Sequence, residues 1–215
     1  MISMYETIME LPLFKGIGSE QVSNFLEKTK LEILNFEAGD FLARNGDRVG
    51  WLDFVITGEI RIIHHLENLD IVIEEKASHG CVIGAVNLFG LVTRHTADVI
   101  ALGKLSVMRI EKEQYFNLLM TDKIYVLNLV NYLSAASQKG ILTIMDIRDF
   151  SIRSRLLTLA NSVAFRNSTK VTVCGDDSVL ADFCGVSVEE FSLWKKNEEE
   201  ARKIEVHGNK IILRP

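Results

Sequence analysis

The chain has 215 residues, of which 47% are hydrophobic and 25% are charged, and its formal net charge is -5. This size suits one large domain or two modest ones of ordinary globular composition. The net negative charge excludes a polycation that binds phosphate over its whole surface. The charge is uneven: residues 1–149 hold 14 Lys and Arg against 20 Asp and Glu, and residues 150–215 hold 10 against 9.

Three scattered cysteines, Cys81, Cys174 and Cys184, form no CxxC pair. They predict neither a zinc ribbon nor a disulfide framework, and free thiols indicate a reducing compartment. No basic segment precedes an apolar run at the N-terminus, and no apolar run is long enough to span a bilayer. We therefore expect a cytoplasmic protein without membrane contact.

In the first half of the chain, the residue pattern changes from one typical of helices to one typical of short strands. Residues 6–29 are predicted to be helical, with Ser19 as a cap for EQVSNFLEK. From Leu31 to Arg109, short β-prone runs alternate with glycines, which is typical of a sandwich or barrel. Helical spacing returns over residues 111–147, first in a short helix and then in a long one.

The long helix carries an apolar stripe that needs a partner. Its own β-domain is one candidate, and the same helix in a second subunit is the other. We favour the dimer, because a long helix between two domains cannot be covered by either alone. The predicted dimer residues are Val126, Leu129, Val130, Leu133, Ala136, Gly140 and Ile144.

After a hinge predicted at residues 148–150, Ser151 is expected to cap another helix, and residues 171–173 form a strand. Residues 176–213 then predict helix, tight turn, second helix and hairpin. Asp176 or Asp177 precedes the helix VLADFC, and Gly185 suits the left-handed turn.

Ser187 suits the N-cap of the second helix, which is expected to run to about Lys203, and Glu190 completes a capping box. His207, Gly208 and Asn209 lie between two β-prone runs, which indicates a hairpin. This is the outline of a winged DNA-reading module, although an ordinary helical hairpin on a β-ribbon fits the spacing equally well.

The order of these elements resembles the cyclic-AMP receptor protein/FNR (Crp/Fnr) superfamily of bacterial transcription regulators. LPLFKGIGSEQV, FEAGDFLARNGDRVGWLDFVITGEIRI, IGAVNLF with HTADVIAL, SRLLTLA, and GVSVEEF with HGNKIIL carry the resemblance. It implies an α+β fold with a cyclic-nucleotide-binding-like β-roll (a jelly roll), a long dimerisation helix and a winged helix-turn-helix. The implied domains are residues 1–110, 111–147 and 148–215.

The effector cassette departs from the family pattern. Cyclic-nucleotide binders of this family place a Glu after the Gly for the ribose, and an Arg before a Ser/Thr-Ala pair for the phosphate. Ala85 and His95 occupy these positions here, with Arg94 one residue earlier. We therefore expect no binding of cyclic AMP, and either an apolar or weakly polar effector or none. The expected pocket residues are Ile83, Gly84, Ala85, Val86, Arg94, His95, Thr96, Gly140 and Ile141.

No cofactor or metal is assigned. The iron–sulfur branch of the family uses an N-terminal cysteine cluster, and this chain has no cysteine before Cys81. A haem would need an axial ligand, and haem stays a minor alternative to ordinary surface or loop histidines. The candidate ligands are His64, His65, His79, His95 and Cys81.

The second helix of the helix-turn-helix also departs from the family, which commonly reads guanine with arginines. Val188 and Leu193 occupy those positions, whereas Glu189 matches. The predicted DNA-contacting residues are Ser187, Val188, Glu189, Glu190, Ser192, Lys195, Lys196 and Lys210. Arg202, Lys203 and either Arg153 or Arg155 are expected to add phosphate contacts.

The favoured function is a homodimeric transcription regulator that a small effector controls. Its expected partners are double-stranded DNA, a second copy and the effector, with RNA polymerase as a further candidate. The alternative is a degenerate member that has lost DNA binding and acts as a sensory or protein-interaction module. We expect no enzyme, because the chain has no paired catalytic carboxylates, nucleophile elbow, Walker loop or HExxH motif.

Overall fold

The computed structural model describes residues 4–145, 149–164 and 170–213. Packing divides the chain into two compact units. The first consists of residues 1–60 and 78–137, and the second of residues 61–77 and 138–215. The domain boundaries expected near residues 110 and 147 stay predictions. Within these units, the start of the long helix packs in the core of the first, and Ile71 and Ile73 pack in the core of the second. Arg148, in the predicted hinge, lies outside the described residues.

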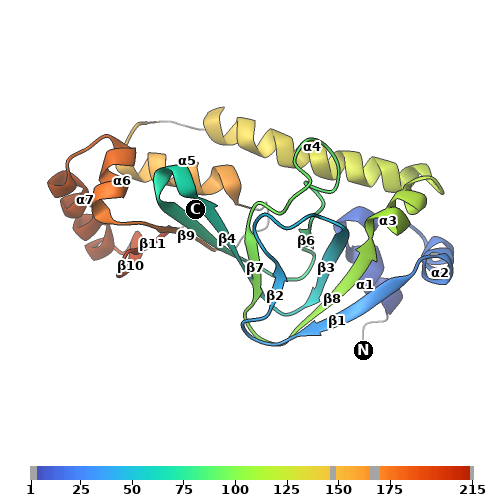
Figure 1. The fold of residues 1–215 in the computed structure, drawn as a ribbon. Helices are drawn as coiled ribbons and strands as arrows, with labels where there is room; N and C mark the ends of the chain where they lie inside the picture. The colour runs from blue at the N-terminus through green and yellow to red at the C-terminus, as the bar shows by residue number, and fades with distance from the viewer. Residues whose placement is uncertain (1–3, 146–148, 165–169, 214–215) are drawn as a thin grey trace. The chain divides into compact units, whose positions relative to one another are not determined.

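The first unit is a β-roll with helices against it (Figure 1). One sheet has the order β1-β8-β3-β6 with antiparallel neighbours, and β2 pairs antiparallel with β7. The expected roll is therefore confirmed. Its strands are β1 (Leu31–Phe36), β2 (Phe41–Ala43), β3 (Trp51–Thr57), β6 (Val82–Ile83), β7 (Asp98–Ala101) and β8 (Leu105–Glu111). Its helices are α1 (Met4–Glu10), η1 (Pro12–Phe14), α2 (Ser19–Lys28), α3 (Lys112–Leu119) and the start of α4 (Lys123–Met145).

One apolar core joins these helices to the sheet. The fully buried Phe14 from η1 lies edge-on to Phe54 of β3, with ring centroids 5.5 Å apart, and contacts Phe25 of α2. Tyr125 and Leu129 of α4 belong to the same core. The cap of α2 was predicted one residue too late. Gly18 is the N-cap, because its N–H donates to the Gln21 side chain at 2.6 Å.

The second unit has a sheet in the order β10-β11-β9-β5-β4 with helices packed on it. Its strands are β4 (Ile60–Leu66), β5 (Ile71–Ala77), β9 (Lys170–Cys174), β10 (Ile204–His207) and β11 (Lys210–Leu213). Its helices are η2 (Glu67–Leu69), α5 (Ile152–Val163), α6 (Asp177–Cys184), α7 (Val188–Glu200) and the last part of α4. Ser151 caps α5 as expected, accepting from the Ser154 N–H.

A second apolar core lies between the helices and the sheet of this unit. Leu156 of α5, Leu180 of α6 and Phe191 of α7 are fully buried there, together with Val173 of β9. The helices α6 and α7, the strand β9 and the hairpin β10–β11 follow the predicted order (Figure 1).

Candidate functional site

The helix-turn-helix is built by local hydrogen bonds. Gly185 adopts the left-handed conformation with φ of 63°, and the turn then reaches Ser187. The Ser187 hydroxyl accepts from the Glu190 N–H at 3.1 Å, and the Glu190 carboxylate accepts from the Ser187 N–H at 3.0 Å. The predicted turn and capping box are thus confirmed. Asp176 occupies the N-cap of α6, but its side chain makes no cap hydrogen bond.

The helix α7 is anchored by one face and open on another. Phe191 is fully buried, and its ring centroid lies 5.5 Å from that of Trp194. Val188 and Leu193 are 43% and 61% exposed. Of the other predicted contact residues on this helix, Glu189, Glu190 and Lys196 are exposed, whereas Ser192 and Lys195 are half-buried. The exposed face therefore offers apolar and acidic side chains where the family that the sequence resembles commonly has arginines.

The helix-turn-helix is strongly acidic. Residues 176–200 carry eight Asp and Glu against two Lys. A duplex presents a dense row of negative phosphates, so this surface repels DNA unless cations near it compensate.

Several cations predicted to meet phosphate are paired with carboxylates. Lys195 contacts Asp177 at 2.5 Å. Lys196 lies 4.0 Å from Glu200, at an exposed position where the pair is weak. On the wing, formed by β10 and β11, Lys210 of β11 contacts Glu74 of β5 at 2.7 Å.

Arg153 and Arg155 connect helices within the second unit. Arg155 donates to the carbonyl oxygens of Cys184 and Phe150, and so ties the start of α5 to the end of α6. Arg153 lies 3.5 Å from Glu198 of α7. These contacts give both arginines a structural role beside the phosphate contacts expected of them.

The effector cassette lies in the first unit, around a glycine with positive φ. Gly84 has φ of +90°, and a Cβ there would lie 2.7 Å from the Trp51 carbonyl oxygen and 3.8 Å from the His95 ring. The structure thus brings Gly84 and His95 together, and their role in an effector pocket stays a prediction. Ile83 and Ala85 are buried, and Ala85 belongs to the apolar core beneath the cassette. An Ala85 that packs in this core is not available to a ligand.

Arg94 is bound to a second loop, between β2 and β3. Its Nη1 donates to the Gly46 carbonyl oxygen at 2.7 Å, and its backbone forms an isolated antiparallel β-bridge with that of Arg48. Arg94 and Thr96 are exposed, and His95 is half-buried. Burial lowers the pKa of His95 against the opposing pull of Asp53 and Asp47, and Arg109 adds to the lowering.

Sequence reasoning missed an ion pair beside this cassette. Arg109 of β8 donates from Nε and Nη2 to the two carboxylate oxygens of Asp53 on β3, at 2.7 and 2.6 Å. Glu32 of β1 is the cross-strand partner of Arg109 on its other side. The hydrogen bonds that Arg109 donates to Asp53 raise the pKa of Arg109. The available signal was a single charge inside each of two apolar runs, WLDFVIT and LSVMRI.

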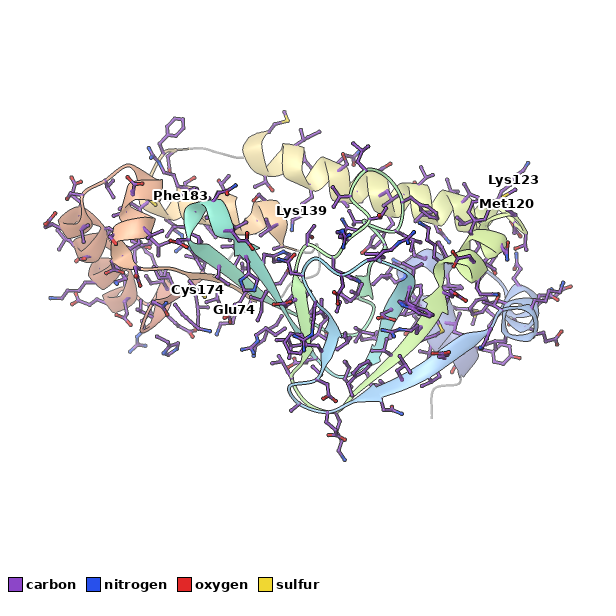
Figure 2. The ribbon with its side chains drawn as sticks, in the orientation of Figure 1. Glu74, Met120, Lys123, Lys139, Cys174 and Phe183 are labelled. Carbon is purple, nitrogen blue, oxygen red and sulfur yellow. The ribbon has the colours of Figure 1, made fainter. Side chains whose placement is uncertain are left out.

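The predicted dimer stripe divides between two faces of α4. Leu129 is buried in the core of its own unit, and Leu133 packs against that core. Val126 and Val130 are exposed, and with Leu127 they line a hollow of about 600 Å³ at the start of α4, next to the labelled Met120 and Lys123 (Figure 2). Ala136 is exposed, and the Ile144 side chain lies outside the described residues.

Gly140 and Ile141, which were expected to meet the effector, belong to the second unit. Ile141 is exposed. Their place in the effector pocket stays a prediction.

Two of the candidate haem ligands, His64 and His79, make polar contacts with other residues. The Nε2 of His64 lies 2.7 Å from a carboxylate oxygen of buried Glu75, and Nδ1 of His79 lies 2.8 Å from the Ile56 carbonyl oxygen. Within residues 4–145, 149–164 and 170–213, no group of three or more His, Cys, Asp and Glu could hold a metal ion. Across the same described ranges, no helix is both long and apolar enough to cross a membrane.

Residues 33–122 match the cyclic nucleotide-binding domain family. The mouse cyclic nucleotide-gated channel beta-3 is 26% identical over 141 residues, which are 63% of this chain and 20% of the channel. The chain therefore spans about a fifth of the length of this curated relative.

Two solved structures are similar along nearly the whole chain. The catabolite activator protein of Thermus thermophilus has a TM-score of 0.55 at 20% identity, covering 94% of this chain and 93% of that one. The c-di-GMP responsive regulator CLP of Xanthomonas campestris has a TM-score of 0.52 at 16% identity, covering 92% and 100%. These likenesses show the fold that the resemblance implied.

Proposed function

We propose that the protein acts as a homodimeric DNA-binding transcription regulator of the Crp/Fnr type. Its fold and its match to the cyclic nucleotide-binding domain family support this proposal. The observation that carries the proposal is the capped α6–turn–α7 pair followed by the wing. In winged helix-turn-helix proteins the second helix enters the major groove and the wing contacts the backbone. RNA polymerase and a cytoplasmic location belong to the same proposal.

The effector, on this proposal, carries no phosphate. Arg109 donates from Nε and Nη2, one edge of its guanidinium, to Asp53, and Arg94 donates to Gly46. Ala85 cannot supply the ribose-binding carboxylate. An anion placed at this cassette would lie near Asp53 and Asp47, and it would have to draw Arg109 or Arg94 away from a present partner, which is costly in a partly dry site. A neutral, apolar or weakly polar molecule fits better, and so does a protein that acts without a ligand.

Titration calorimetry with cyclic AMP tests the effector proposal. We expect no saturable heat at micromolar ligand. A saturating isotherm would refute it, and would mean that Arg94 leaves Gly46 to reach the phosphate. An Arg94→Gln variant then separates specific binding from background, because it would abolish that isotherm.

The dimer is proposed to form along α4. Val126, Leu127 and Val130 expose a contiguous apolar face, and a second α4 supplies the kind of surface that fills it. Sedimentation of the full chain is expected to show a dimer, and Val130→Asp is expected to shift it to monomer. Leu193→Asp, which changes an equally exposed apolar residue on α7, serves as the control and should leave the dimer intact.

Selection of bound sequences from random duplex DNA, at two salt concentrations, tests the function itself. We expect a pseudo-palindromic motif whose affinity falls as salt rises, because phosphate contacts release counterions. A folded dimer that recovers no motif would contradict DNA reading.

The acidity of the helix-turn-helix favours a second candidate function. Eight carboxylates against two lysines over residues 176–200, with exposed Val188 and Leu193, suit a surface that binds protein. On this alternative the winged unit has lost DNA binding and serves as a sensory or protein-interaction module. The same selection separates the two, because such a module shows no salt-dependent affinity for DNA.

A further inference from the structure

The hairpin β4–β5 is built into the sheet of the winged unit, although its sequence lies between roll strands. Residues 61–77 belong to the second unit, whereas the residues before and after them belong to the first. Strand β5 pairs antiparallel with β9 over five residues, from Val72 opposite Cys174 to Lys76 opposite Lys170. Without β5, strand β9 would be an exposed sheet edge, which proteins generally cover.

The inward face of β5 completes the core of this unit. Ile71 and Ile73 are fully buried beside residues of α5, α6 and α7. Further along the same strand, the buried Glu75 lies 2.7 Å from His64 of β4, a contact that joins the two strands of the hairpin. Two buried isoleucines and a buried polar contact are difficult to expose, so the hairpin is a permanent part of the unit.

The opposite face of β5 meets the wing. Glu74 accepts from the Lys210 ammonium at 2.7 Å, across the intervening strand β9. Figure 2 shows Glu74 beside Cys174 on the neighbouring strand. Burial and the Glu74 carboxylate raise the pKa of Cys174 to about 11. The ion pair is half exposed, with 40% and 18% of the two side chains accessible, so the ammonium can exchange partners.

We propose that the β4–β5 hairpin is a fixed part of the DNA-binding unit and attenuates it, because Glu74 neutralises the wing lysine Lys210 that would otherwise meet a DNA phosphate. The attenuation rests on the proposed DNA-binding function, whereas the fixed pairing of the hairpin does not. On this proposal the hairpin moves with the wing, and a change in the roll at either end of residues 61–77 reaches the wing directly.

A disulfide tests the pairing in the full chain. Cross-strand neighbours have Cα atoms about 4.5–5.5 Å apart, which suits a disulfide. Val72→Cys should therefore form one with the native Cys174 under mild oxidation, seen as a loss of two mass units and as a linked peptide. Lys76→Cys, on the same face but opposite Lys170, is the matched control and should form no bond to Cys174. Absence of the Val72→Cys bond would overturn the pairing.

Glu74→Gln tests the attenuation, with a random-sequence duplex as the probe. Freeing Lys210 should raise affinity at low salt by about two- to five-fold, and should steepen the dependence of log affinity on log salt by about one. Glu205→Gln, which removes a carboxylate paired with Lys170 at 3.2 Å, is the control and should change the slope less. Adding Lys210→Gln to Glu74→Gln should abolish the gain.

The outcomes separate the two proposals. If the wild type binds DNA and Glu74→Gln changes neither affinity nor slope beyond the control, the attenuation is wrong and the function stands. If no variant binds DNA at low salt, the function fails and the attenuation fails with it, while the disulfide still decides whether the hairpin pairs with β9. If the oxidised Val72→Cys protein binds DNA more than ten-fold more weakly than its reduced form, the hairpin must detach for binding, and its fixed role is overturned.

Discussion

The roll and the wing each hold a cation against a carboxylate, but in different ways. Arg109 of the roll makes two hydrogen bonds to Asp53, and 20% and 6% of the two side chains are exposed. Lys210 of the wing makes one contact to Glu74 and stays twice as exposed as Arg109. The first pair is satisfied and shielded, so an incoming anion gains little there. The second pair is more exposed and can exchange partners, so Glu74 weakens the attraction of the wing for DNA without abolishing it.

Removing Asp53 should have the largest effect on this comparison. Asp53→Ala leaves Arg109 without its bidentate partner in a mostly buried position, and we expect a loss of about 3 kcal/mol in the free energy of unfolding. Urea denaturation of the full chain, followed by tryptophan fluorescence, measures it. Glu74→Ala, which breaks the wing pair, should cost less than about 1 kcal/mol. Equal losses would show that the roll pair is no better shielded than the wing pair.

A smaller loss is expected from the glycine at the cassette. Gly84→Ala places a Cβ 2.7 Å from the Trp51 carbonyl oxygen at a φ of +90°, and should cost about 2 kcal/mol. Gly90→Ala is matched in backbone angle, with φ of +94°, but has no atom within 4 Å of the added Cβ. Thermal unfolding of the two variants should therefore differ, with Gly84→Ala melting lower. Coincident melting curves would rule out the close contact.

An arginine at the start of α7 should give the winged unit the cation that it lacks there. Val188→Arg is expected to strengthen DNA binding and to favour guanine at one position of each half-site by about 1 kcal/mol. Selection of preferred sites with both proteins is the measurement. Leu193→Ala is the control, since it alters the same exposed face without adding charge. No change at any base would contradict the assignment of α7 as the reading helix.

The smallest effect concerns pH. Burial lowers the pKa of His95 below its ordinary value of 6.5, so the unfolded chain binds this proton more readily than the folded one. The free energy of unfolding should therefore fall as the pH drops below about 6.5, by less than about 1 kcal/mol from this group. His95→Gln should remove that part of the pH dependence. A variant that follows the wild-type pH profile would show that His95 does not titrate in this way.

Local signals predicted the helix-turn-helix well. Ser187 and Glu190 lie one helical turn apart, and Gly185 needs only its own backbone, so spacing in the sequence was sufficient. The wing followed from a turn between two short β-prone runs. Which of these residues contact DNA stays a prediction, because no element of the sequence or the fold places a duplex on them.

Contacts between distant residues escaped prediction. Asp53 and Arg109 are 56 residues apart, and the sequence alone does not show which strands become neighbours. The stripe on α4 could not be divided between its two faces for the same reason. Leu129 and Val130 follow one another along the helix, yet the first packs into the core and the second is exposed. Periodicity identifies an apolar surface but not what covers it.

The antiparallel ladder between β5 and β9 joins residues about 100 positions apart. The entropy cost of closing such a long loop must be met before the strand contacts stabilise the fold. This sheet should therefore be among the last parts to form during refolding. During synthesis Ile71 and Ile73 emerge well before β9, and they need protection from aggregation in that interval. If residues 148–215 were grafted onto another roll, their sheet would lack β5, the strand that pairs with β9. This module therefore cannot be exchanged between proteins as one continuous segment.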